Sequence, residues 1–155
     1  MSSRALSLWL TPSLVRPYNA PGSVAPAEAL SELIGSLVSH DPEAPVFSPH
    51  CTLLTGFVSL EDDATLQSKL QQLVDDFKAT LEGRTGITLA FRHLEARDAY
   101  FQTLIALTDL PSELQKLHEM AKAAMPTSRA PPNPSYDPHV SLMCCLSFPL
   151  TWATR

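Results

Sequence analysis

Residues 49–53, PHCTL, and residues 138–142, PHVSL, share one pattern: proline, histidine, a hydroxyl residue and leucine at the same spacing. In a β-strand, residues i and i+2 point to the same face of the sheet. Each segment, as a strand, would therefore present an imidazole and a hydroxyl to one side, and two such strands side by side would suit a bound phosphate. Each could instead be a buried strand with a core histidine, which leaves the repetition unexplained. The four residues concerned are His50, Thr52, His139 and Ser141.

The composition is that of a small globular protein. The chain has 155 residues, 45% hydrophobic and 17% charged, which is enough for one domain with a substantial core. Its net charge of −5 argues against a protein that wraps a polynucleotide, because such proteins present a basic face. A small anionic substrate held by a few local donors is compatible with this charge.

The cysteines and the apolar segments exclude some classes of protein. Cys144 and Cys145 are neighbours and Cys51 is far away in the sequence, so no disulfide framework is indicated and a reduced, intracellular context is expected. Residues 5–10 are too short for an export signal and are predicted to form a strand. The apolar stretch 141–153 is too short to span a membrane.

Hydrophobic periodicity predicts an alternation of strands and helices. The predicted strands are residues 5–10, 50–58, 87–91 and 100–107 and the second motif; the predicted helices are residues 27–38, a helix after Asp63 with an apolar stripe from Leu66 to Leu81, and residues 111–124. Residues 93–98 are polar and are predicted to connect two strands. This order indicates one domain over residues 1–155, built of two similar half-units that each carry one histidine strand.

Positions outside the two motifs are expected to be mainly structural. His40 follows a helix, where a cation is favourable. His118 is expected on the surface of a helix. His93 is expected in a solvated connection with substrate-side potential. Cys51 lies between the two motif positions, so it is expected to point to the opposite face and into the core.

The two motifs together resemble the 2H phosphoesterase superfamily, most closely its 2′,3′-cyclic nucleotide 3′-phosphodiesterase branch of fungi and plants. The resemblance covers residues 5–143. It includes SLWL at residues 7–10, PVFSPH at 45–50, YFQ at 100–102 and YDPH at 136–139. It implies an α+β, two-lobed, pseudo-two-fold fold, with mainly antiparallel sheets flanked by helices around a central cleft.

The C-terminal segment departs from the family pattern. Relatives continue past the second motif with another helix and closing strands, whereas residues 143–155 follow a different course to Arg155. We therefore expect an atypical tail in which the final helix and strands are missing. On that expectation the chain by itself would be poorly stable.

The resemblance implies an enzyme that hydrolyses 2′,3′-cyclic nucleotides to 2′-phosphates, or ADP-ribose 1″,2″-cyclic phosphate to ADP-ribose 1″-phosphate. Opening a cyclic phosphate needs a base for the attacking water and an acid for the departing alkoxide, and two imidazoles can share these roles near neutral pH. By resemblance His50 is the acid and His139 the base, an order that can be reversed. Thr52 and Ser141 would hold the phosphate. Candidate substrate contacts are Tyr136, Tyr100 and Gln102.

No cofactor and no metal is expected, because the sequence holds no cluster of metal-ligand spacing. The implied partner is a small cyclic-phosphate substrate, with no stable polynucleotide bound and no membrane span, and the protein is expected to be a monomer.

The implied setting is intracellular, cytoplasmic or Golgi-associated, in cyclic nucleotide catabolism and RNA metabolism, including tRNA splicing products. Two alternatives are a 2H enzyme that processes RNA ends, as a ligase or a 3′-end exonuclease, and a truncated inactive family member.

Overall fold

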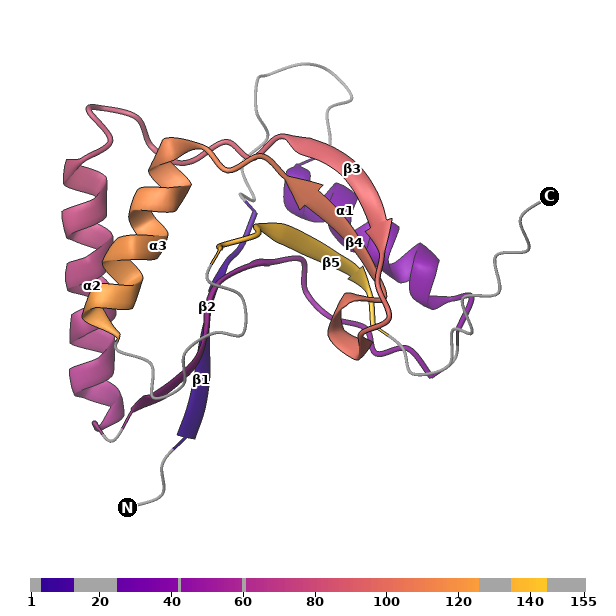
Figure 1. Ribbon diagram of the computed structural model, residues 1–155, viewed down its shortest axis with the longest axis horizontal. Helices are drawn as coiled ribbons and strands as arrows, with labels where there is room; N and C mark the ends of the chain where they lie inside the picture. The colour runs from indigo at the N-terminus through magenta and orange to yellow at the C-terminus, as the bar shows by residue number, and fades with distance from the viewer. Residues whose placement is uncertain (1–3, 13–24, 42, 60, 126–134, 145–155) are drawn as a thin grey trace. The chain divides into compact units, whose positions relative to one another are not determined.

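The computed structural model describes residues 4–12, 25–41, 43–59, 61–125 and 135–144 (Figure 1). Within these ranges the chain forms three α-helices, five strands and one 3-10 helix. They are β1 (Arg4–Leu10), α1 (Pro26–Val38), β2 (Cys51–Ser59), α2 (Asp63–Ala79), β3 (Phe91–Ala96), η1 (Tyr100–Gln102), β4 (Leu104–Thr108), α3 (Ser112–Ala124) and β5 (His139–Met143). The strands form one five-stranded sheet in the order β1-β2-β5-β4-β3. The β2–β5, β5–β4 and β4–β3 pairs are antiparallel, so the fold is α+β as expected.

The chain divides into two compact units, each assembled from separate stretches of sequence. Unit 1 contains β1 up to Trp9, β2 from Thr52 onward, α2 and α3. Unit 2 contains α1, β3, η1, β4 and β5, together with His50 and Cys51.

In unit 1, α2 and α3 lie side by side (Figure 1). Helix α2 begins where the Asp62 carboxylate accepts a hydrogen bond of 2.8 Å from the Thr65 backbone N–H, which also lowers the pKa of that carboxyl group. The apolar stripe predicted for α2 contributes Leu73 and Phe77 to the core, and α3 contributes Leu114 and Leu117. Burying each such side chain stabilises the fold by about 1.5–3 kcal/mol.

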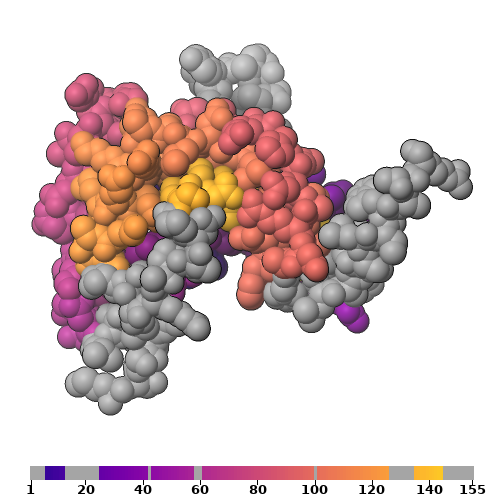
Figure 2. Space-filling view, in the orientation of Figure 1, coloured from indigo at the N-terminus to yellow at the C-terminus, as the bar shows by residue number. Residues whose placement is uncertain are grey.

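In unit 2, α1 covers one face of the strands β3, β4 and β5 (Figure 1). Ile34 of α1 and Leu142 of β5 are 0% and 1% exposed, and this packing fixes which face of β5 is buried. Strand β4 lies between β5 and β3 and is apolar from Leu104 to Leu107, as suits a strand with neighbours on both sides. In the space-filling view, the yellow surface of β5 borders that of the β3–β4 segment (Figure 2).

Two strand predictions around β3 and β4 are wrong. Residues 87–90 form no strand, and β3 instead runs through Phe91–Ala96, most of which was expected to be a connection. Its antiparallel partner β4 ends at Thr108, which pairs with Phe91, the first residue of β3. Just beyond this pair, Asp109 N–H donates a hydrogen bond to Ala90 C=O. Strand pairing therefore ends at Phe91 and Thr108, with one further backbone bond at Ala90, and alternation of residue types cannot reveal where a partner strand ends.

The predicted strand 100–107 is also partly wrong. Tyr100–Gln102 form the 3-10 helix η1, and the strand begins only at Leu104. The backbone bond Gln102 N–H to Ala99 C=O (2.9 Å) tightens this turn, and Arg97 N–H to Thr103 C=O (3.2 Å) closes the hairpin around it. The segment therefore joins β3 to β4.

The expected tail is described only at its start. Met143 and Cys144 are buried, and residues 145–155 lie outside the described residues. Among the helices that the structure describes, none combines the length and apolarity needed to cross a membrane.

Candidate active site

The centres of the two motifs pair directly. Cys51 of β2 is opposite Val140 of β5, and both are buried, at 2% and 6% exposure. The prediction that Cys51 lies in the core is therefore confirmed. Because neighbouring residues of a strand point to opposite faces, His139 and Ser141 share the face opposite the buried Val140. His50, Ser141 and His139 are each partly exposed, as this arrangement requires.

His50 directly precedes β2 and its ring is oriented by the loop before it. Its Nδ1 lies 2.7 Å from the backbone carbonyl of Ser48, and its ring meets that of Phe47 edge-on, with centroids 6.2 Å apart. A carbonyl only accepts hydrogen bonds, so the proton of the neutral ring lies on Nδ1. The same bond persists when the ring is protonated, because Nδ1 carries a proton in both states.

His139 begins β5 and contacts one of the candidate substrate-binding residues. Its Nε2 lies 3.2 Å from Nε2 of Gln102, the last residue of η1. The other end of that amide, Oε1, accepts a hydrogen bond of 3.1 Å from Nη1 of Arg97. Arg97 was not singled out from the sequence, where the only signal is its place in the polar stretch 93–98.

Ser141 is anchored to the same 3-10 helix. Its hydroxyl donates to the backbone carbonyl of Phe101 at 2.9 Å, and the Cys144 thiol donates to the same carbonyl at 3.5 Å. The Phe101 side chain itself is 73% exposed.

Thr52 belongs to unit 1, where its backbone carbonyl is hydrogen-bonded to a side chain. Its carbonyl accepts a hydrogen bond of 3.1 Å from the Tyr136 hydroxyl. The Tyr136 ring stacks on that of His118, with centroids 4.0 Å apart and planes 5° apart, and His118 Nδ1 donates to Leu53 C=O at 2.7 Å. The expectation that His118 is a surface residue is wrong, because this ring is partly buried between β2 and Tyr136.

The remaining candidates have separate outcomes. Tyr100 begins η1, and its side chain lies outside the described residues. His93 is on β3 instead of in a loop, and pairs with Leu107, which in turn pairs with His139. Paired residues point to the same face of a sheet, so His93 and His139 share a face of unit 2. His40 is exposed just after α1, as expected.

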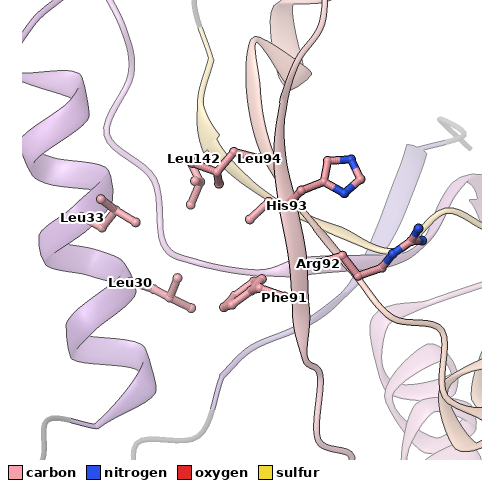
Figure 3. Close-up of a pocket in the computed structure, with 8 residues that line it drawn as sticks. Leu30, Leu33, Phe91, Arg92, His93, Leu94 and Leu142 are labelled. Atoms are coloured by element: carbon pink, nitrogen blue, oxygen red, sulfur yellow. The ribbon is translucent and has the colours of Figure 1, made fainter.

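An apolar pocket lies on the opposite face of these strands. Leu30 and Leu33 of α1 point toward Phe91, Leu94 and Leu142, whereas His93 and Arg92 point away from them (Figure 3). This pocket has almost no polar groups that could bind a phosphate. We therefore locate the candidate chemistry on the His139 face.

The acidic and histidine side chains of the described residues form no group of three that could hold a metal ion. Within unit 2, the structure places the His139 imidazole against the Gln102 amide, two groups that can transfer protons and donate hydrogen bonds.

Comparison with known proteins identifies one family. The model of the family described as cyclic phosphodiesterase-like protein matches residues 4–147, and so includes both histidine motifs and all of the described helices and strands. A search of curated proteins gives no match.

Proposed function

The chain belongs to the cyclic phosphodiesterase-like protein family, and from this membership we propose that it hydrolyses nucleoside 2′,3′-cyclic phosphates to nucleoside 2′-phosphates. The family supports a function of the cyclic phosphodiesterase type. The finer assignment rests on one observation, the pairing of Cys51 with Val140 at the centres of the two motifs. That pairing supports joint action of the motif histidines on one phosphate.

In the proposed reaction, a water oxygen attacks phosphorus while the bond from phosphorus to the 3′ oxygen breaks. Nε2 of His139 takes the proton that the water loses, and Nε2 of His50 gives a proton to the departing 3′ oxygen. The product carries its phosphate on the 2′ oxygen and a hydroxyl on the 3′ carbon. Two imidazoles that exchange protons near neutral pH are suited to both transfers.

The surroundings of His50 favour the acid role for this residue. A general acid must hold two ring protons before the reaction, and the Ser48 carbonyl accepts one of them in the charged as well as the neutral ring.

Thr52 and Ser141 are the proposed phosphate donors. Their hydroxyls would bond to the non-bridging oxygens, where negative charge grows in the transition state. The Ser141 hydroxyl now donates to Phe101 C=O, and rotation about its Cβ–Oγ bond redirects that proton toward a phosphate. Phe101, Tyr100 and Tyr136 are proposed contacts for the base or the ribose, with Phe101 supported by its exposure.

The setting proposed for this activity is intracellular. The enzyme would act as a monomer on small cyclic phosphates left by RNA processing, including tRNA splicing. The net charge of −5 supports a small substrate over a polynucleotide.

The substrate range tests this proposal directly. We expect the purified chain to open a nucleoside 2′,3′-cyclic phosphate to the 2′-phosphate only, with ADP-ribose 1″,2″-cyclic phosphate as a second small substrate. A 3′,5′-cyclic nucleotide should not react, because its six-membered ring presents the phosphate differently. Phosphorus NMR separates the 2′- and 3′-phosphate products.

Three outcomes of that assay would contradict the proposal. Comparable turnover of the 3′,5′-cyclic compound or formation of the 3′-phosphate would exclude the assigned regiochemistry. Preference for an oligonucleotide end over the mononucleotide would favour an RNA-end-processing enzyme. No turnover of any of these compounds would favour an inactive family member.

Hydrolysis should also persist in excess chelator. Proton transfer by the two histidines needs no ion at the phosphate, so a preparation treated with EDTA should keep its kcat within about twofold. Strong inhibition that is reversed by one divalent ion would instead indicate a metal-assisted mechanism. The same assay with a zinc-dependent phosphodiesterase provides the positive control for chelation.

A further inference from the structure

We propose that Arg97 and Gln102 form a positioning pair that fixes the tautomer of His139 and thereby prepares it as the base; this rests on the function proposed above. Gln102 then acts through His139 and does not bind the substrate. The three residues belong to unit 2, on the β3–β4 hairpin and the adjoining strand β5.

The orientation of the Gln102 amide follows from Arg97. A guanidinium group only donates hydrogen bonds, so the amide atom 3.1 Å from Arg97 Nη1 must be the carbonyl oxygen. If the amide were turned over, its NH2 group would face another donor. Arg97 therefore directs the NH2 group of Gln102 toward His139.

The tautomer of His139 follows from this orientation. The NH2 group of Gln102 donates to Nε2 of His139 at 3.2 Å, so Nε2 presents its lone pair and the proton of the neutral ring lies on Nδ1. Protonation of Nε2 would bring an N–H bond against the amide NH2. The contact thus selects the tautomer that leaves Nε2 able to accept a proton, which is the tautomer that a general base acting through Nε2 requires.

Hydrogen bonds fix both the side chain and the backbone of Arg97. Its Nε donates to Glu95 Oε1 at 2.6 Å, and its backbone N–H donates to the Thr103 carbonyl at 3.2 Å. The Arg97 side chain is 27% exposed, which restricts the conformations open to it. A chain of four polar side chains therefore runs from Glu95 through Arg97 and Gln102 to His139.

The lone pair on Nε2 accepts one strong hydrogen bond at a time, so the water that attacks phosphorus must replace the Gln102 amide. Gln102 holds the ring in the required tautomer until that exchange. Its role resembles that of other side chains that orient a catalytic imidazole, where imposing the wrong tautomer costs up to about 10⁴-fold in rate.

The tautomer is measurable without any activity. In the full chain labelled with ¹⁵N-histidine at about pH 8, where imidazoles are ordinarily neutral, we expect the His139 signals to report a protonated Nδ1 and an unprotonated Nε2. Gln102→Glu should move the proton to Nε2, because a carboxylate accepts from both Arg97 and His139. Gln67→Glu, on the exposed side of α2, adds the same charge and should change nothing.

Kinetics then separate positioning from substrate binding. Arg97→Ala should lower kcat by roughly 10–10³-fold with KM within about threefold, whereas Arg97→Lys, still a pure donor, should recover most of the loss. Arg84→Ala removes the same charge from an exposed side chain of unit 1 that pairs with Glu113, and should leave kcat near the wild-type value. Thermal melts of all variants verify that each is folded.

Two results would overturn the positioning role. One is an NMR result in which His139 of the wild type carries its proton on Nε2, or in which Gln102→Glu leaves the His139 tautomer unchanged. The other is an Arg97→Ala variant in which KM rises while kcat stays at the wild-type value, as for a substrate contact. Failure of the proposed function is distinguishable, since a wild-type chain with no hydrolysis of cyclic phosphates leaves the tautomer measurement intact.

Discussion

His50→Ala and His139→Ala should each lower kcat for hydrolysis of a nucleoside 2′,3′-cyclic phosphate by roughly 10²–10⁴-fold, the usual loss when one general acid or base is removed. Both rings act in the same chemical step, so neither can replace the other. Both are partly exposed, so truncation leaves no large cavity in the core. The measurement is steady-state kinetics on each purified variant beside the wild type.

His40→Ala is the matched control, because this exposed histidine lies just after α1 and outside the motifs. It should retain wild-type kcat and melting temperature. If either motif variant retained full activity while His40→Ala behaved as expected, the catalytic roles of the two histidines would be excluded. The double variant should lose little more than the worse single one, because residues that act as a unit are not additive.

Loss of the phosphate donors should have the second-largest effect. Thr52→Val and Ser141→Ala are expected to lower kcat by roughly 10–10³-fold, since each removes one hydrogen bond to an oxygen whose charge grows in the transition state. Thr52→Ser and Ser141→Thr keep the hydroxyl and should keep most of the activity. The comparison within each pair isolates the hydroxyl from the rest of the side chain.

Ser141 needs one further control because its hydroxyl also anchors η1 at Phe101. The Cys144 thiol donates to the same carbonyl, so Cys144→Ala tests this anchoring without touching the motif. Thr55→Val removes an exposed hydroxyl from β2 that bonds to Ser7 at 3.0 Å, and should leave kcat unchanged. Equal losses for Thr52→Val and Thr55→Val would mean that strand stability, and not phosphate binding, explains the effect.

The features that could be predicted from the sequence are those encoded over short distances. Helix α1 was expected over residues 27–38 and spans Pro26–Val38, because a proline at its start and an apolar stripe suffice to define it. The alternation within each motif likewise predicted a core position for Cys51, flanked by polar residues on the other face. Such patterns depend only on the period of the backbone.

Contacts between distant segments were decided by the tertiary structure. Residues 87–91 have the alternation of a strand, yet pairing extends only from Phe91 to Ala96, because the partner strand β4 ends opposite Phe91. His118 contacts the Leu53 carbonyl from 65 residues away, which no helical pattern of α3 could indicate. The Arg97–Gln102–His139 contacts depend in the same way on the β3–β4 turn and on the register of β5.

The sequence by itself thus determined the two histidine motifs, the helices and the core position of Cys51 between His50 and Thr52, since all of these follow from local periodicity. Tertiary structure alone decided which donors and acceptors the motif side chains meet. A hydrogen bond forms between particular atoms about 3 Å apart, and the register of paired strands and the shape of a turn set that distance. For this chain, Ser48 C=O at His50 and the Gln102 amide at His139 are therefore products of the fold.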